Sequence, residues 1–73
     1  MFDMLTLDQL YTLHTSLFDA HQKLHVLLVD RPGTGPVIPY GPDWNIANAA
    51  CSELTETMIW VGAEITRRVM ADA

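Results

Sequence analysis

Three histidines in the first half of the chain are the residues whose type and spacing could do chemistry. His21 and His25 stand four residues apart, and His14 lies in line with them nearer the N-terminus. Two histidines four apart share one face of a helix and are the minimum for a pair of metal ligands. The sequence identifies no further ligand, so we predict no metal and no cofactor. We expect instead that these histidines lie in an interface, bonded to polar partners; the alternatives are a metal site completed by Asp or Glu from a neighbouring subunit and a pH-sensitive assembly.

Other chemical signatures are weak. The single cysteine, Cys51, has no activating group near it in the sequence and is expected to be a small buried core residue. The glycine-containing stretch after Arg31 lacks the lysine and the helix start of a phosphate-binding loop, and there is no nucleophile motif. We therefore expect no enzyme activity.

Two amphipathic stretches, joined by a Pro/Gly-rich elbow, must position these residues. All four prolines and three of the four glycines fall between Pro32 and Pro42. The flanking periodicity predicts one domain, residues 1–73, with helices at about 7–30 and 43–70 and an elbow at about 31–43. Thr6 and Gln9 have the spacing of a capping box at the start of the first helix. The predicted fold class is all-α, an antiparallel two-helix hairpin.

Each predicted helix carries an apolar core stripe at spacings of three and four. In the first helix the stripe is Leu10, Leu13, Leu17, Ala20, Leu24 and Leu27; in the second it is Ala47, Cys51, Leu54, Met58, Val61, Ile65 and Val69. The elbow segment 36–40 is too rigid and apolar for a flexible tether, and we expect it to fold back over the open end of the hairpin.

Apolar residues outside these stripes predict that the chain assembles. A second stripe on the first helix, the histidine stripe, spans about 80° and consists of Tyr11, His14, Phe18, His21 and His25. The second helix projects Trp60 and Ile59 from its flanks. A hairpin covers one face per helix, so the remaining faces need partners; at 73 residues with one cysteine, the chain is also short for a stable monomer. We expect a homo-oligomeric helical bundle whose interface includes His14, Phe18, His21, His25 and Ile59.

The charge balance limits the partners. The net charge is −5, with only Lys23, Arg31, Arg67 and Arg68 as basic residues, which argues against binding to duplex nucleic acid. A small anion could still bind where arginines from several subunits meet. The N-terminus lacks the pattern of a signal peptide, and no apolar run approaches the ~20 residues of a membrane span. We expect a cytoplasmic protein that makes no membrane contact.

The segment from Ser52 to Arg67 resembles the closing helix of small phage-encoded sponges for cyclic-nucleotide immune signals, the anti-CBASS and anti-Thoeris proteins with a helical-hairpin domain. The residues at the offsets of the family motif are Leu54, Glu56, Trp60, Ile65 and Arg67, with Ile59 where the family tends to have methionine. The stretch from Leu10 to Leu28 is compatible with the family's first helix. Gly62 stands where the family has asparagine, and the elbow is longer than the family's short turn.

The resemblance implies a compact homo-oligomer, often a hexamer, that binds cyclic di- or trinucleotides between protomers without cleaving them in the host cytoplasm. In such a site Tyr11 and Trp60 would stack on bases, and Lys23, Arg67 and Arg68 would meet phosphates. The alternative is an oligomeric helical module that binds a host or phage protein through the face around Trp60 or through the histidines. A purely structural small protein is the third possibility.

Overall fold

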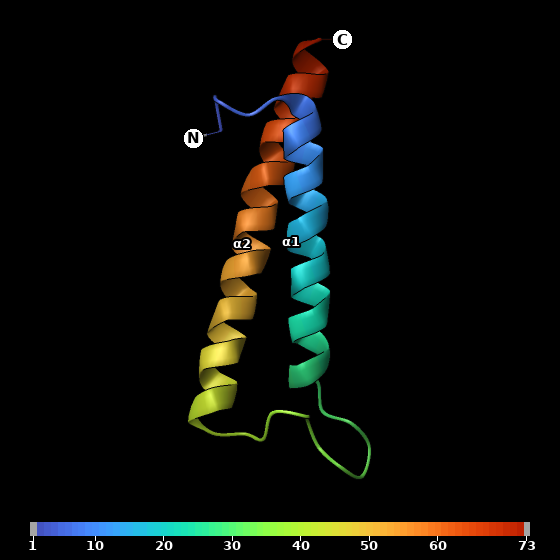
Figure 1. Ribbon diagram of the computed structural model, residues 1–73, viewed down its shortest axis with the longest axis vertical. Coiled ribbons are helices and arrows are strands. Elements are labelled where there is room, and N and C mark those ends of the chain that lie inside the picture. Colours follow the sequence, from blue (N-terminus) through green and yellow to red (C-terminus); the bar gives the residue numbers. More distant parts are fainter. Residues whose placement is uncertain (1, 73) are drawn as a thin grey trace.

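The computed structural model describes residues 2–72, which form two helices and the segments that flank them. Helix α1 spans Leu7–Leu28 and helix α2 spans Pro42–Ala71. The helices lie side by side and run antiparallel, and the connecting segment passes beneath both (Figure 1). The described residues contain no strand. The predicted all-α hairpin is therefore confirmed, with α1 ending two residues before the predicted boundary.

Helix α1 begins with the predicted capping box. The backbone N–H of Gln9 donates to Oγ1 of Thr6 at 3.1 Å, and the backbone N–H of Thr6 donates to Oε1 of Gln9 at 2.9 Å. These two bonds satisfy donors that a helix N-terminus otherwise leaves without partners. Helix α2 begins at Pro42, whose missing N–H and fixed φ suit the first helical position.

The segment between the helices folds back on the end of α1. The backbone N–H of Ile38 donates to the carbonyl oxygen of Leu27 at 3.0 Å, and the indole N–H of Trp44 donates to that of Leu28 at 3.1 Å. The rings of Tyr40 and Trp44 pack at 5.2 Å between centroids. Carbonyl groups at the C-terminus of a helix lack intrahelical donors, so these contacts both end α1 and hold the start of α2 against it.

The two helices meet along a seam that repeats every 3.5 residues on average, the period of a coiled coil. All seam positions are buried or half-buried. On α1 they are Leu7, Leu10, His14, Leu17, His21, Leu24 and Leu28, and on α2 they are Trp44, Ala47, Cys51, Leu54, Met58, Val61, Ile65 and Arg68. Leu13 and Leu27 are half-buried on the flank of this seam.

The predicted core stripes were wrong at Ala20 and Val69, which are both exposed. His21 and Arg68 occupy the seam at those levels instead. At the level of His21 the physical reason is a small residue on the facing helix: Cys51 lies opposite the imidazole ring and leaves room for it. The face of α1 that contacts α2 therefore includes His14 and His21 and excludes Ala20.

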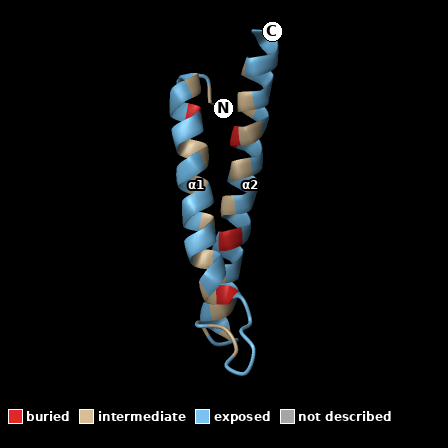
Figure 2. Cartoon of the chain, turned by 90° about the vertical axis from the view of Figure 1, so that its right-hand side faces the viewer, coloured by how far each residue is buried: buried red, intermediate tan, exposed pale blue. Residues whose placement is uncertain are grey.

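A single hairpin leaves much of its surface uncovered. Four hydrophobic residues are buried, Leu10, Leu28, Cys51 and Val61, and they form separate bands along the helices (Figure 2). The accessible surface of 5318 Å² exceeds by about 800 Å² the value of about 4500 Å² for a compact monomer of this mass. The radius of gyration is 15.7 Å, against about 11 Å for a compact domain of this length. Within residues 2–72, neither helix is apolar enough over a bilayer's thickness to cross a membrane.

Candidate functional site

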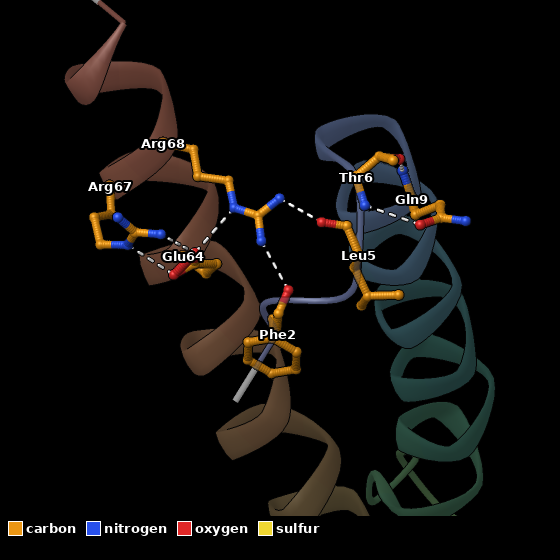
Figure 3. A network of polar contacts seen from close by, with 7 residues as sticks. All are labelled: Phe2, Leu5, Thr6, Gln9, Glu64, Arg67 and Arg68. Carbon is orange, nitrogen blue, oxygen red and sulfur yellow. Dashed lines mark hydrogen bonds and ion pairs between the residues drawn. The ribbon is translucent and has the colours of Figure 1, made fainter.

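The N-terminal segment is tied to the last turns of α2 by Arg68 (Figure 3). Nη2 of Arg68 donates to the carbonyl oxygen of Phe2 at 2.7 Å, and Nη1 donates to the carbonyl oxygen of Leu5. Nε donates to Glu64 at 3.0 Å. Because all three guanidinium nitrogens have partners within the chain, Arg68 positions residues 2–5 on α2.

Arg67 binds the same carboxylate from the solvent side. Its Nε donates to Oε1 of Glu64 at 2.8 Å and its Nη2 donates to Oε2 at 2.6 Å. Hydrogen bonds from Arg67, and next from Arg68, lower the pKa of Glu64 to about 2. The two guanidinium groups and the Glu64 carboxylate together carry one positive charge, which Asp72 at the C-cap of α2 and Asp3 beside Arg67 offset, on a chain whose net charge is −5.

This arrangement encloses a small surface pocket of about 250 Å³ lined by Phe2, Trp60, Ala63, Glu64 and Arg67. Trp60 and Arg67 are seven residues apart, which places them on the same face of α2. Phe2 joins them because Arg68 holds its backbone. The pocket thus combines two aromatic rings with an exposed guanidinium, the two kinds of group that recognise bases and phosphates.

The other predicted ligand-binding residues lie outside this pocket. Tyr11 is on α1, half-exposed. Lys23 pairs with Asp19 at 2.8 Å, and its hydrogen bond to that carboxylate raises the pKa of Lys23. Twelve residues along one helix span about 18 Å, so a single pocket of this size does not collect both Tyr11 and Lys23. Of the five predicted residues, Trp60 and Arg67 line this pocket together within one copy of the chain.

A larger hollow of about 400 Å³ lies on α1 alone. Its lining residues are Asp8, Gln9, Thr12, Leu13 and Ser16. No second element closes it, and it presents neither a cation nor an aromatic ring, so it lacks the groups that would select a ligand.

The residues predicted to lie between copies separate into two groups. Phe18 and Ile59 are 52% and 65% exposed and project away from the seam, and His25 is also exposed. His14 and His21 are instead half-buried between α1 and α2. The predicted histidine stripe is therefore shared between the contact face of the hairpin and its outer surface.

The hairpin also brings together three potential metal ligands that the sequence analysis kept apart. One ligand atom each from His21, His25 and Cys51 all lie within 4.8 Å of one another. The two imidazole rings stack with centroids 5.6 Å apart and planes at 12°. The predicted burial of Cys51 is confirmed; the sequence places no activating group near it, but the fold of α2 against α1 brings it to His21 and His25.

Sequence reasoning missed Phe2 and Cys51 because contacts between distant parts of the chain bring each of them to its neighbours. Phe2 stands outside any helix, and only the contacts of Arg68 bring it to Trp60. Cys51 meets His21 and His25 only once the register of the two helices is fixed. The spacing of four between the histidines was the one available signal.

Compared with known proteins, the chain matches no family model, no curated protein and no solved structure.

Proposed function

We propose that this protein is a homo-oligomer that binds and sequesters cyclic di- or trinucleotides without cleaving them, in pockets built around Trp60 and Arg67. The observation that supports the proposal is the pocket itself, in which an indole, a phenyl ring and a guanidinium surround one space. Stacking of a base on an aromatic ring contributes about 1–3 kcal/mol in proteins that bind single-stranded nucleic acids. An arginine fork matches the geometry of a phosphate. Because Nε and Nη2 of Arg67 already donate to Glu64, a phosphate would bind the remaining N–H groups or displace that carboxylate.

The electrostatic attraction for an anion rests on Arg67 itself. The chain as a whole repels anions, and the one net positive charge of Arg67, Arg68 and Glu64 is offset by Asp3 and Asp72 at the same end of the molecule. Arg67 is the member whose side chain is 63% exposed. Arg68 supports the site indirectly by holding Phe2 in place.

Two quantities support the proposal that more than one copy builds the complete site. The pocket of about 250 Å³ is smaller than the roughly 300–1,000 Å³ of typical small-molecule sites. The surface excess of about 800 Å² equals what each partner buries in a protein interface of standard size. A second copy could bring Lys23 or Tyr11 to the pocket, which one copy alone does not.

The test is isothermal titration of the untagged chain, at known oligomeric mass, with a panel of cyclic di- and trinucleotides and cyclic ADP-ribose isomers. We expect tight binding to one class, with the ligand recovered chemically unchanged. Trp60→Ala should weaken binding by roughly 5- to 150-fold, the equivalent of one lost stack. Arg67→Ala should weaken it while leaving the oligomer intact.

Arg31→Ala is the matched control, since it removes the same charge from the elbow at the other end of the hairpin. It should leave the affinity unchanged. Absence of binding across the whole panel, by a folded oligomer, would overturn the proposal. An equal loss of affinity in Arg31→Ala and Arg67→Ala would show that only the overall charge affects binding. It would contradict a specific role for the pocket at Trp60.

A second function is favoured by the exposed apolar side chains beside the pocket. Ile59 and Trp60 are 65% and 55% exposed on an acidic chain, which suits a module that binds another protein. This alternative predicts no affinity for any nucleotide. It also predicts an apolar groove at Trp60 that stays open in the isolated assembly, where a dye for exposed apolar surface would bind and lose its signal in Trp60→Ala.

A further inference from the structure

We propose that His21, His25 and Cys51 form a binding site for a divalent transition-metal ion, such as Zn²⁺, between α1 and α2. One ring nitrogen from each histidine and Sγ of Cys51 lie within 4.8 Å of one another. The site lies nearer the elbow than the pocket at Trp60, which is nine residues from Cys51, or about 13 Å along α2. The two proposals therefore stand or fall separately.

The donor set determines the class of ion. Two imidazole nitrogens and one thiolate suit Zn²⁺ and its neighbours in the first transition row, and carboxylate oxygens, which Mg²⁺ and Ca²⁺ require, are absent from this group. His21 and His25 supply the pair of ligands four residues apart on one helix. Cys51 supplies the ligand from the facing helix, so the ion would join two elements that are distant in the sequence.

The distances require only a small closure. With metal–nitrogen and metal–sulfur bonds of about 2.1 and 2.3 Å, ligand atoms in a tetrahedral site lie about 3.4–3.6 Å apart. The present separations of up to 4.8 Å must therefore shorten by roughly 1 Å. The two imidazole rings stack with planes at 12°, and the lone pair of each nitrogen lies in its ring plane, so binding also turns at least one ring out of the stack.

A buried nitrogen atom at the same place is a second observation that supports a metal ion there. Nδ1 of His21 is shielded from solvent, and no group among the described residues forms a hydrogen bond with it. Buried polar atoms in folded proteins nearly always have a partner, and an unaccounted ion is one of the recognised explanations for an exception. A metal ion would bind either Nδ1 of His21 itself or the other nitrogen of the same ring.

An ion at this position would stabilise a fold that has few other means. The described chain buries only four hydrophobic residues, and one cysteine cannot form a disulfide within the chain. Chains of this size commonly rely on a metal or on oligomerisation. Three protein ligands leave a fourth position for water or another donor, on the side where His25 is exposed.

The experiment uses the full, untagged, reduced chain after chelation, titrated with Co²⁺ as the spectroscopic probe and then with Zn²⁺. We expect one Co²⁺ per chain, with the visible bands of tetrahedral cobalt and a thiolate-to-cobalt charge-transfer band, displaced by Zn²⁺. The Cys51 thiol loses its proton to solvent as the metal–sulfur bond forms, so binding should release protons and weaken as the pH falls. At free Zn²⁺ about 100 times the dissociation constant, the thermal midpoint should rise by roughly 10–20 °C.

Three variants separate a site from general metal affinity. His25→Gln changes an exposed residue and should leave the fold intact while weakening Co²⁺ binding by roughly tenfold or more. Cys51→Ser should abolish the charge-transfer band. His14→Gln removes the one histidine outside the cluster and should bind Co²⁺ like the unmodified chain.

Three results would overturn the proposal. The first is the absence of a charge-transfer band when the unmodified chain is saturated with Co²⁺. The second is an affinity that falls no more in His25→Gln than in His14→Gln. The third is a stoichiometry of half an ion per chain, because it would place the ion between copies and not within one hairpin.

Discussion

Nη2 of Arg68 donates a hydrogen bond of 2.7 Å to the carbonyl oxygen of Phe2, a residue 66 positions earlier in the chain. The bond joins the end of α2 to the segment that precedes α1 (Figure 3). It also explains how Phe2 comes to line the same pocket as Trp60. One arginine thus connects the stability of the open end of the hairpin with the shape of its candidate site.

Arg68→Ala should therefore release the N-terminal segment and lower the stability of the hairpin. Hydrogen bonds to charged groups contribute about 1.5–3 kcal/mol, and for a domain of this size each kcal/mol shifts the thermal midpoint by about 4–8 °C. We expect a fall of at least several degrees, together with faster amide exchange at residues 3–6. Circular-dichroism melting and hydrogen-exchange mass spectrometry measure the two effects.

Arg67→Ala is the matched comparison for that prediction. Arg67 is adjacent to Arg68 but pairs only with Glu64, at the exposed surface. Exposed ion pairs add little to stability, so the midpoint and the exchange of residues 3–6 should stay close to those of the unmodified chain. If both variants lost the same stability, the contacts to Phe2 and Leu5 would not be what holds the segment.

The pH dependence of stability should carry a contribution from Glu64. Its folded pKa is about 2, below the ordinary value of 4.5, because Arg67 and then Arg68 donate hydrogen bonds to the carboxylate. A lowered folded pKa stabilises the native state fully above the unfolded value, and this contribution is lost as the pH falls from about 4.5 toward 2. The free energy of unfolding should therefore fall more steeply in this window for the unmodified chain than for Glu64→Gln.

Glu56→Gln provides the control for the acid range. Glu56 is exposed on α2 and forms no ion pair among the described residues. Because Glu56 lacks such a partner, the curves of unfolding free energy against pH should run parallel for Glu56→Gln and the unmodified chain. Parallel curves for Glu64→Gln and the unmodified chain would contradict the role assigned to Glu64.

Local signals in the sequence were sufficient for the hairpin itself. The Thr6–Gln9 spacing marked the start of α1, and the prolines marked the region where neither helix could continue. The end of α1 was placed two residues late because a contact from a distant residue decides it. Trp44 donates to the carbonyl oxygen of Leu28, and Val29 already has an extended backbone.

The choice of contact face on α1 could not be predicted from that helix alone. Leu10, Leu17 and Leu24 belong equally to a seam that includes Ala20 and to one that includes His21. The decision comes from α2, where the small residue Cys51 leaves space for the imidazole ring of His21. The same non-local choice determined the cluster with Cys51, while the contribution of Phe2 to the pocket depended on the conformation of one arginine side chain.

Trp44→Phe should weaken the closure of the hairpin at the elbow. The substitution keeps a ring beside Tyr40 but removes the indole donor to the carbonyl oxygen of Leu28, now 3.1 Å away. A hydrogen bond of this kind contributes about 1 kcal/mol, so the thermal midpoint should fall by about 4–8 °C. Tyr40→Phe keeps the ring contact and removes a hydroxyl that has no hydrogen bond within the described chain, so it should have little effect. An unchanged midpoint in Trp44→Phe would mean that ring packing alone closes the elbow.

Gly62→Ala should stabilise the hairpin, although it adds an atom in the seam. The new Cβ would lie 3.8 Å from Nε2 and 3.9 Å from Cδ2 of His14, which is ordinary van der Waals contact. Glycine inside a helix costs about 0.5–1 kcal/mol relative to alanine, so the midpoint should rise by a few degrees. Ala49→Gly, at an exposed position of α2, should lower it by a similar amount.

The direction of the Gly62→Ala change also tests why glycine occupies this position. A rise in stability with the oligomeric mass unchanged in sedimentation would mean that the hairpin tolerates a larger residue and that His14 can pack against it. A rise in stability accompanied by loss of the oligomer would assign the glycine to close approach by a second copy. A fall in stability would contradict the expectation, because it would show that the ring of His14 cannot yield to a Cβ atom at ordinary contact distance.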